Sequence, residues 1–510
     1  MNPGDARTLD EVPAAQATAM PGAVALRGAA GSLTFAALEA RVDAAAALLH
    51  AQWGVRPGDR VAWLGANDVA QVVLLFALAR IGAAWLPMNF RLSEAEWQRL
   101  LDACSPCVLV HGEGFGDAAA PLARRRSIPC IAAVELMAES SAPAPRLAAP
   151  TSPVLLVQTS GTTGGPRVAV HTQANLLANM RIAAHAQAIT PGDVVLTVLP
   201  LFHVGGLCIQ TLPALYAGAT VILHPRFSPD DVLACIADER PTLTLQVPAT
   251  MKALIEHPAW AATDLSSLRA MWAGSSVIPR EIVDAIHARK VPVCNVYGAT
   301  ETGPFSIALP PEHAFTHAGS CGWTAQGVEA RLVEAGRPGE VKEVGEPGVA
   351  GEIMLRGANI VARYWPDIPA LDGDGWFRTG DLATRAADGS YTIVGRAKEL
   401  IISGGENIHP MEIEQVLSGH PSVAECAAFG VPDARWGEAV AVAVVLGSPA
   451  NESELRGHLD GRLARFKHPR HWHFVDALPK TALGKVRRGE LAAALIRPSP
   501  KASNEPAPRA

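Results

Sequence analysis

The sequence predicts an α/β protein: a large N-terminal part with parallel-rich sheets covered by helices, followed by a second, smaller domain. Three observations lead to this prediction. Helical and strand patterns alternate through the first 150 residues, which is typical of parallel sheets covered by helices. The chain has 510 residues, whereas single hydrophobic cores stop growing near about 250–300. A glycine- and aspartate-rich segment at 369–398 precedes about a hundred residues with their own alternation, enough for a small domain.

The first elements follow from local signals. Thr34 is a suitable helix N-cap, and the apolar residues after it recur at helical spacing until Gly54 ends the run. The patterns predict a short apolar strand at 60–64, a buried helix at 69–81 and another strand at 83–87. This strand–helix–strand order favours parallel neighbours in one sheet.

The domain bounds are predicted from composition. Residues 138–153 are rich in alanine, proline and serine, which is typical of a surface connection. The large domain is predicted to span 1–397 and the small domain 398–496, and the composition of 497–510 is typical of a disordered tail. Within the small domain the patterns predict a helix at 412–417, a strand at 439–446 and another helix at 452–463.

Charge and composition exclude several classes of function. The net charge of −6 gives no general attraction to nucleic acid or to anionic lipid, so neither is an expected partner. The N-terminus has no secretory signal pattern, and the apolar run Val72–Ala79 is far shorter than the about 20 residues that span a bilayer. The eight cysteines follow no framework spacing, which is typical of reduced thiols in a cytoplasmic protein. A homodimer stays open.

The most informative segment is the loop at 159–167, which follows an apolar run at 154–157. Its glycines let backbone N–H groups approach a polyanion, its hydroxyl side chains add donors, and Arg167 adds positive charge. These properties indicate phosphate binding. The loop is not of the Walker type, because no Gly-Lys-Ser/Thr sequence follows and 168–170 is predicted to be a strand. A surface turn is the weaker alternative for so dense a run.

The loop resembles the signature of the adenylate-forming superfamily, which includes acyl-CoA synthetases, luciferases and the adenylation domains of peptide synthetases. Further segments resemble motifs of that superfamily in the same order. They are Pro200–His203 for the acid pocket, Tyr297–Thr302 for adenine and magnesium, Thr379–Asp381 with Gly395–Arg396 for ribose, and Pro479–Lys485 for the catalytic lysine. The resemblance covers roughly residues 20–495. It implies a small mobile α+β C-terminal domain and an enzyme that joins a carboxylic acid to AMP.

The resemblance implies roles for the residues around the phosphates. Because ATP and the acid are both anionic, neutralising their charges is the main catalytic task. Glu301 is expected to position Mg²⁺, a cation that prefers carboxylate and phosphate oxygens, together with Thr162. Thr300 is expected to contact the α-phosphate, and Lys485 to lie between that phosphate and the carboxylate. The residues expected to hold the other phosphates are Thr159, Ser160, Gly161, Thr162, Thr163, Gly164 and Arg167.

The resemblance also assigns residues to the nucleoside. Tyr297 is expected to stack on adenine. Asp381 is expected to accept hydrogen bonds from the ribose hydroxyls, and Arg396 to add a donor. Taken singly, Asp381 could instead cap a turn and Tyr297 could lie in the core. The residues expected to line the base are Gly274, Ser275, Ser276, Asn295, Gly298 and Ala299.

One position departs from the pattern of the superfamily. The loop usually carries lysine followed by glycine, whereas this chain has Arg167 and Val168. Arginine keeps the charge and can bind phosphate bidentately, although with a different geometry. We expect an active enzyme with altered affinity for ATP. An inactive relative is the alternative, against which the presence of Glu301, Asp381 and Lys485 argues.

The same resemblance implies a second step on CoA. Lys398 occupies the hinge position of acyl-CoA synthetases, and Ser403, Gly404 and Gly405 resemble the loop beside the channel for the pantetheine arm. The expected substrates are therefore ATP with Mg²⁺, CoA and a carboxylic acid. Two alternatives stay open, namely loading of a carrier-protein phosphopantetheine and luciferase-like oxidation of the adenylate.

The acid itself is specified less closely. Trp272 offers an apolar or aromatic wall, and small residues leave room beside it. A dicarboxylate would need a cation for its second carboxylate, and the stretch 247–254 offers only Lys252. A medium-chain or aromatic monocarboxylate is therefore preferred over malonate, which stays an alternative. The residues expected in the pocket are His203, which is also a candidate catalytic residue, Gly205, Gly206, Val247, Trp272 and Gly303.

Other conspicuous residues have simpler interpretations. Two groups of histidines lack acidic or cysteine partners in the sequence and are predicted to lie on solvated surface. They are His313 with His317, and His468 with His471 and His473. Acetylation of Lys485 would remove a charge that adenylation needs, and whether the enzyme is regulated in this way stays open.

Overall fold

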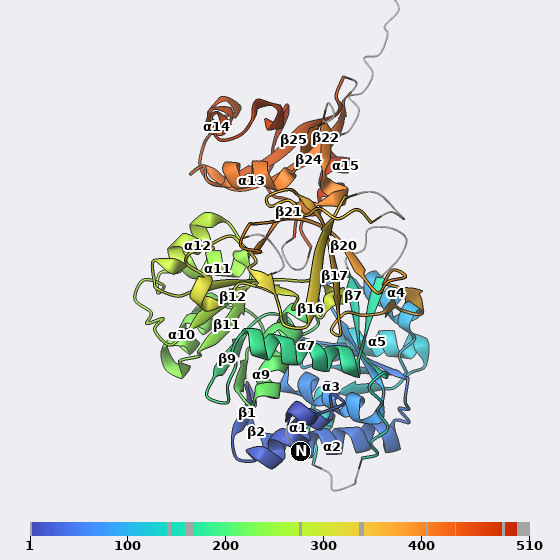
Figure 1. Ribbon diagram of the computed structural model, residues 1–510. Coiled ribbons are helices and arrows are strands. Elements are labelled where there is room, and N and C mark those ends of the chain that lie inside the picture. The colour runs from blue at the N-terminus through green and yellow to red at the C-terminus, as the bar shows by residue number, and fades with distance from the viewer. Residues whose placement is uncertain are drawn as a thin grey trace, which may run out of the picture. The chain divides into compact units, whose positions relative to one another are not determined.

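The computed structural model describes residues 3–139, 144–159, 167–274, 278–335, 341–403, 406–433, 435–481 and 485–496. The chain forms two compact units (Figure 1). The first comprises Met1–Thr379 with Ala383–Ile393, and the second comprises Gly380–Leu382 with Val394–Ala510. The predicted boundary after residue 397 lies close to this division.

The first unit contains an eight-stranded sheet in the order β19-β18-β8-β7-β4-β3-β5-β6. Its strands are β3 (Arg60–Leu64), β4 (Ala84–Met88), β5 (Val108–His111), β6 (Cys130–Ala132), β7 (Pro153–Thr159), β8 (Arg167–Thr172), β18 (Arg363–Tyr364) and β19 (Ile368–Pro369). The strands β3, β4, β5, β6 and β7 run parallel to one another, whereas β8 runs antiparallel to β7. The prediction of a parallel-rich sheet is confirmed.

The predicted buried helix at 69–81 is confirmed as α3 (Val69–Ile81), which follows the predicted strand at 60–64. The Asp68 side chain accepts a hydrogen bond from the Ala70 backbone N–H and so caps the first turn. Gly82 ends the helix in a left-handed conformation with φ 75°, which costs other residues strain. The next strand begins at Ala84, one residue later than predicted.

A nine-stranded sheet in the same unit has the order β15-β14-β13-β12-β11-β9-β10-β1-β2. Its strands are β1 (Val24–Gly28), β2 (Gly31–Thr34), β9 (Val194–Thr197), β10 (Thr220–Leu223), β11 (Leu243–Gln246), β12 (Ala270–Ala273), β13 (Val293–Tyr297), β14 (Ile307–Ala308) and β15 (Trp323–Thr324). The run from β13 to β1 is parallel throughout.

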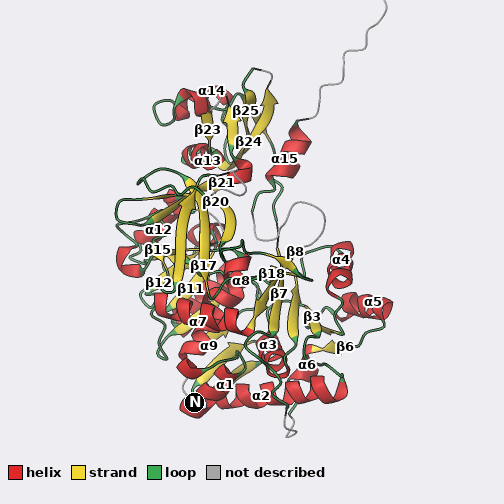
Figure 2. Cartoon of the chain, turned by 45° about the vertical axis from the view of Figure 1, so that its right-hand side comes forward, coloured by secondary structure: helices red, strands yellow, loops and turns green. Residues whose placement is uncertain are grey.

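Helices cover both of these sheets, as Figure 2 shows. They are α1 (Glu11–Ala19), α2 (Phe35–Ala47), α4 (Glu94–Cys104), α5 (Gly116–Arg126), α6 (Ala133–Leu136), α7 (Gln173–Ala186), α8 (Val204–Gly206), α9 (Leu212–Ala217), α10 (Pro229–Glu239), α11 (Pro248–Ile255) and α12 (Arg280–His287). The largest core joins apolar side chains of both sheets with α2, α3 and α7. The predicted N-cap of α2 is confirmed, since the Thr34 hydroxyl accepts from the Ala37 N–H.

A four-stranded sheet has the order β16-β17-β20-β21. Its strands are β16 (Val328–Val333), β17 (Gly351–Gly357), β20 (Phe377–Arg385) and β21 (Tyr391–Arg396). β16 and β17 pair antiparallel, and the chain enters the second unit at the end of β21.

The second unit is a small α+β fold, as predicted. Its strands are β22 (Ile401–Ser403), β23 (Glu406–Ile408), β24 (Val423–Asp433), β25 (Gly437–Leu446) and β26 (His471–Phe474), and its helices are α13 (Pro410–Ser418), α14 (Glu452–Leu459) and α15 (Arg488–Leu495). The prediction that α14 continues to 463 is wrong. Asp460 leaves the helical conformation and Gly461 has φ 73°, so the helix ends there.

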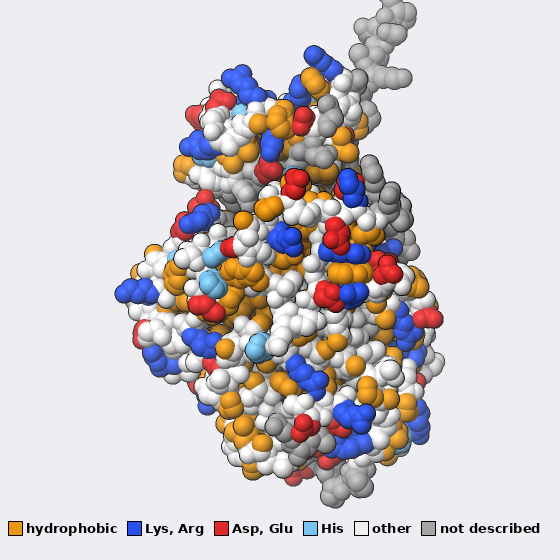
Figure 3. All heavy atoms as spheres, in the orientation of Figure 1, with side chains coloured by type: hydrophobic (Ala, Val, Ile, Leu, Met, Phe, Trp, Pro, Cys, Tyr) orange, Lys and Arg blue, Asp and Glu red, His pale blue; other side chains and the backbone are white. Residues whose placement is uncertain are grey.

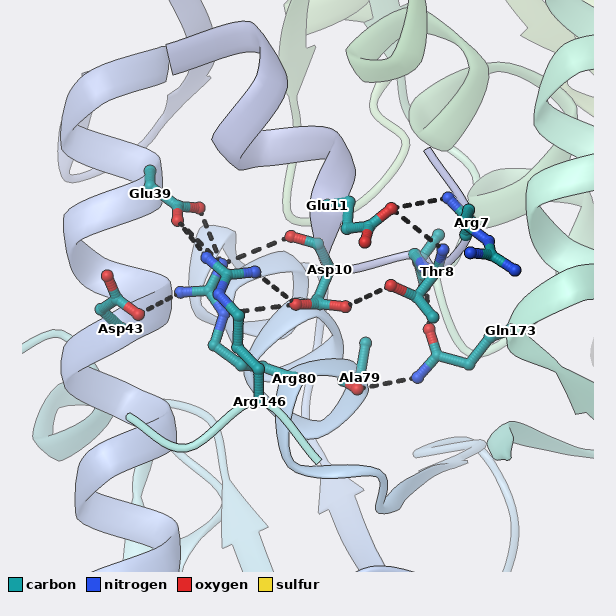
Figure 4. A network of polar contacts seen from close by, with 11 residues as sticks. Arg7, Thr8, Asp10, Glu11, Glu39, Asp43, Ala79, Arg80, Arg146 and Gln173 are labelled. Atoms are coloured by element: carbon teal, nitrogen blue, oxygen red, sulfur yellow. Dashed lines mark hydrogen bonds and ion pairs between the residues drawn. The ribbon is translucent and has the colours of Figure 1, made fainter. Parts of the chain in front are cut away.

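A buried arginine ties the N-terminal helices of the first unit together (Figure 4). The Arg80 side chain on α3 is 0% exposed and donates to both carboxylate oxygens of Glu39 and to Asp43 on α2. Its Nε lies 3.6 Å from Asp10, which also accepts from Arg146 Nη1 at 2.6 Å. Burial lowers the pKa of Arg80, but the surrounding carboxylates outweigh burial and leave that pKa raised.

The surface carries charges of both signs. On the face drawn in Figure 3, basic and acidic side chains are interspersed. Across the described ranges, helices are too short or too polar to cross a bilayer. All eight cysteines are free thiols. Burial raises the pKa of both Cys104 and Cys107, to about 12 and about 11, so neither resembles a reactive thiolate.

Candidate active site

The carboxyl ends of the parallel strands gather the predicted acid and adenine residues at one edge of the nine-stranded sheet. β11, β12 and β13 pair in register, with Gln246 opposite Ala273 and Ala273 opposite Asn295. Val247 and Gly274 therefore follow these strand ends directly, beside the segment after β13. Ligands of open α/β sheets bind outside the carboxyl ends of the strands, so this edge is the candidate site.

The turn after β13 requires its glycines for close packing. A Cβ on Gly298 would lie 1.6 Å from the Pro304 carbonyl oxygen. Gly303 has φ 98°, and a Cβ there would lie 2.7 Å from Asn179 Oδ1. The Thr302 hydroxyl accepts from the Ala299 N–H at 2.9 Å and closes the turn. These glycines hold the turn that carries Thr300 and Glu301, which is a role the motif alone did not indicate.

Glu301 is joined to Arg167 through a tyrosine that the sequence interpretation missed. Tyr364 donates its hydroxyl proton to Glu301 Oε1 at 2.8 Å, and the Arg167 guanidinium carbon lies 5.6 Å from the centroid of its ring. Burial and then Glu301 raise the pKa of Tyr364, so the hydroxyl keeps its proton and donates. The second Glu301 oxygen can bind Mg²⁺ alongside phosphate oxygens, so the donor set fits this cation.

Replacing Tyr364 with phenylalanine is expected to raise the KM for magnesium-ATP by about tenfold, because residues that orient a metal ligand contribute about 10–100-fold. The matched control is Tyr391→Phe, which removes a hydroxyl that donates to the Ala330 carbonyl at 3.4 Å in the same unit. Steady-state kinetics with varied magnesium-ATP measure both variants. Equal KM values for the two would contradict the proposed role of Tyr364.

The phosphate loop is described only at its two ends. Thr159 on β7 pairs with Arg167 on β8, and the Thr159 hydroxyl donates to the Arg167 carbonyl at 3.4 Å. A β-hairpin therefore presents the loop, as the strand prediction for 168–170 requires. The predicted residues Ser160, Gly161, Thr162, Thr163 and Gly164, with Ser275 and Ser276 of the base loop, lie outside the described residues.

His203, at the end of the predicted acid-pocket segment 200–203, is a neutral imidazole. Its Nδ1 accepts from the Gly205 N–H at 3.0 Å, which leaves Nε2 to carry the proton. Burial lowers the pKa of His203 to about 4. Gly206 has a packing role as well, because a Cβ there would lie 2.5 Å from the Leu199 carbonyl oxygen. The pocket segment therefore offers a hydrogen-bond donor but no positive charge at neutral pH.

The side chains of Trp272 and Tyr297 are buried, and neither aromatic ring is freely exposed. Trp272 is 0% exposed and its ring centroid lies 5.8 Å from that of Phe305. Tyr297 is 8% exposed and belongs to the main core. Asn295 lines a hollow beside β13 and donates to Cys321 Sγ at 3.4 Å. Their assignments to the acid and to adenine stay predictions.

The second unit contains the residues predicted to bind ribose and the predicted catalytic lysine. Arg396 Nε lies 2.7 Å from Asp381 Oδ1. Burial and then Arg396 lower the pKa of Lys485, against the opposing effects of Asp381 and Glu399. The Lys485 carbonyl accepts from the Thr481 N–H at 2.7 Å. Together these residues form one charged cluster, which consists of Asp381, Arg396, Glu399 and Lys485.

A partly buried arginine that the sequence motifs did not reveal supports this cluster. Arg488, three residues after Lys485, donates to Glu399 at 2.7 Å and to both oxygens of Glu414 at 2.7 and 2.8 Å. Glu399 follows the predicted hinge residue Lys398. Ser403 pairs with Glu406 at the end of β22, and Gly404 and Gly405 lie outside the described residues.

The lowered pKa of Lys485 predicts how adenylation depends on pH. If the ammonium is the active form, the rate falls as pH rises through the folded pKa. That fall should begin below the ordinary lysine value of 10.5. ATP–pyrophosphate exchange across alkaline pH measures it, and Lys485→Arg should move the fall to higher pH because arginine stays charged. A fall at the same pH in both proteins would assign it to another group.

One surface prediction needs correction. His317 does have an acidic partner, because its Nε2 lies 2.9 Å from Asp388 Oδ2, and the ring of His313 packs against it. Spacing could not show this contact, since Asp388 comes 71 residues later. Within the described part of the chain, however, no group of three His, Cys, Asp or Glu side chains could hold a metal ion.

The chain is similar to known enzymes over most of its length. The family model described as "AMP-binding enzyme" matches residues 13–365, and that described as "AMP-binding enzyme C-terminal domain" matches 412–485. An indoleacetate–CoA ligase of Aromatoleum aromaticum is 41% identical over 489 residues, 92% of this chain and 95% of the relative. A feruloyl-CoA synthase of an Amycolatopsis species is 39% identical over 489 residues, 95% of this chain and 98% of the relative.

Solved structures agree with these matches. ATP-bound MatB from Rhodopseudomonas palustris aligns with a TM-score of 0.87 and 30% identity, over 96% of this chain and 99% of that one. The o-succinylbenzoate CoA synthetase MenE from Bacillus subtilis, in complex with its acyl-adenylate intermediate, aligns with a TM-score of 0.85 and 31% identity, over 94% and 97%.

Proposed function

The chain belongs to the family of AMP-binding enzymes, and from this premise we propose that it is an ATP-dependent acid–CoA ligase for aromatic monocarboxylates. The observation that carries the substrate class is the similarity to two ligases named for indoleacetate and feruloyl-CoA, each aligned over more than nine-tenths of this chain. The acid is first joined to AMP with release of pyrophosphate, and CoA then displaces AMP to form the thioester.

Each charged residue of the candidate site has a proposed role in the first step. Arg167 and the loop before it bind the terminal phosphates of ATP. Glu301, oriented by Tyr364, would hold Mg²⁺, which when bound would neutralise phosphate charge. Asp381 accepts from the ribose hydroxyls. Lys485 would supply an ammonium that neutralises charge on the acid and on the α-phosphate, and burial strengthens such interactions.

The charges near the acid pocket support a monocarboxylate over malonate. Lys252 on α11 is the cation of 247–254, and its side chain is 49% exposed and lies 3.8 Å from Glu256. His203 is neutral, as its lowered pKa shows. These residues therefore offer no buried cation that would pair with a second carboxylate. Malonate is therefore the dicarboxylate against which the aromatic acids are tested.

Two further features of the enzyme are proposed. The free thiols at all eight cysteines support a reducing compartment, so we place the enzyme in the cytoplasm. Free CoA is the proposed acceptor, because the relatives are named as CoA ligases or synthases. A homodimer stays a prediction.

An assay of acids and acceptors tests the proposal. The purified enzyme is given magnesium-ATP with indoleacetate, ferulate, octanoate or malonate, and with either CoA or a phosphopantetheinylated carrier protein. We expect the aromatic acids to give CoA thioesters with the highest kcat/KM. Thioester formation on the carrier alone, or strong selectivity for malonate, would overturn the proposal.

A further inference from the structure

A buried glutamine on the π-helical turn η3 (Leu207–Thr211) has an unpaired acceptor. Gln210 is 1% exposed, and its Nε2 donates to Gln187 Oε1 at 3.1 Å. The Gln187 amide nitrogen donates to the Ile209 and Ala183 carbonyls, so its oxygen must be the acceptor from Gln210. Among the described residues, Gln210 Oε1 then has no partner. The orientation of this amide follows from the network.

An unpaired donor lies on the same side of the nine-stranded sheet. Trp272 pairs with Leu245 across β12 and β11, so the two side chains face the same way. The indole Nε1–H of Trp272 is buried without a partner in the described chain. Leu245, Gln210 and Gly206 together line one small hollow, too narrow in this conformation to hold a water molecule.

This hollow adjoins the predicted acid pocket, since Gly206 belongs to both. A π-helical turn is rare in proteins and is frequent at functional sites. An unpaired buried acceptor destabilises the folded chain, and a donor on a bound molecule beside Gln210 would complete its hydrogen bonding. Both features occur in the segment that continues directly from His203.

We propose that Gln210 determines specificity by accepting a hydrogen bond from an N–H or O–H group on the ring system of an aromatic acid. This inference rests on the proposed ligase function and refines its substrate class. The acids named for the two relatives carry such donors, an indole N–H and a phenol O–H. A site built around a buried acceptor discriminates strongly against an analogue that lacks the donor.

Two acids of nearly equal shape test the inference. Indoleacetate carries the ring N–H, whereas benzothiopheneacetate has sulfur in its place. The wild-type enzyme should prefer indoleacetate by at least about tenfold in kcat/KM for thioester formation. Gln210→Leu should bring the ratio close to one, mainly through loss of activity on indoleacetate. Because both acids are assayed on one preparation, the ratio does not depend on how much of the variant is folded. Gln210→Met repeats the test if the leucine variant is insoluble.

Gln246 provides a matched control on the other face of the sheet. It is 0% exposed, its Nε2 donates to the Thr244 hydroxyl at 2.9 Å, and its Oε1 is likewise unpaired among the described residues. It pairs with Ala273, whose side chain belongs to the opposite core, so Gln246→Leu should keep the wild-type ratio.

The outcomes separate the inference from the function on which it rests. A wild-type ratio near one, or an unchanged ratio in Gln210→Leu, would overturn the role of Gln210 while thioesters still form. If neither acid gave a thioester, the ligase assignment itself would be overturned instead.

Discussion

Replacing Lys485 with methionine is expected to lower the rate of adenylation by about 100- to 1,000-fold, the usual effect of removing one donor that stabilises developing charge. Methionine keeps the length and apolar stem of lysine but removes the ammonium. Burial and the neighbouring Arg396 already depress the pKa of Lys485, so its charge is held in a partly desolvated cluster. ATP–pyrophosphate exchange with indoleacetate measures this half-reaction alone.

The matched control is Lys480→Met, five residues earlier in the same motif. Lys480 forms an ion pair with Glu425, and both side chains are more than one third exposed, so its loss should change the exchange rate little. The Lys485 variant should still convert chemically prepared acyl-AMP and CoA to the thioester. If it lost both half-reactions equally, Lys485 would be a structural residue.

Replacing Arg80 with leucine is expected to lower the free energy of unfolding of the first unit by about 3–5 kcal/mol, the usual cost of removing one partner from a buried ion-pair network. The network joins α2, α3 and the N-terminal segment, as Figure 4 shows. Without Arg80, the cation still paired with Asp10 and Glu39 in the described part of the chain would be Arg146, which is itself 47% exposed. Thermal and urea unfolding of the full chain measure the change.

Arg41→Leu on the neighbouring helix α2 is the control for this variant. Arg41 pairs with Glu139, which is 88% exposed, so the expected loss is below about 1 kcal/mol. Equal destabilisation by the two variants would contradict the importance of burial. A fully stable Arg80→Leu protein would show that apolar packing replaces the network without loss.

Much of the scaffold was predictable from local pattern. The helix at 69–81 is apolar around its whole circumference and is capped by Asp68 and Gly82, so its bounds were correct. The end of α14 was not predicted, because the apolar spacing continues to Leu463 while the backbone turns at Asp460. The order of strands in each sheet depends on pairing between distant segments, which no local pattern encodes.

The site was predictable where a contiguous motif carries it. Glu301, Asp381 and Lys485 lie within such motifs, whereas their supporting residues do not. Tyr364 bonds to Glu301 across 63 residues, and Arg488 to Glu399 across 89. Neither residue type is unusual in its local sequence, so only the fold brings these supports to the functional side chains.

Transfer of heavy oxygen from the acid to AMP tests the central claim most directly. The enzyme is incubated with magnesium-ATP, CoA and indoleacetate labelled with heavy oxygen in its carboxylate, and the nucleotide product is analysed by mass spectrometry. If an acyl-adenylate forms, the thiol attacks its carbonyl and one carboxylate oxygen leaves with AMP. The account predicts labelled AMP, unlabelled pyrophosphate and an indoleacetyl-CoA thioester in equal amounts. Unlabelled AMP, or ADP with labelled phosphate, would contradict it.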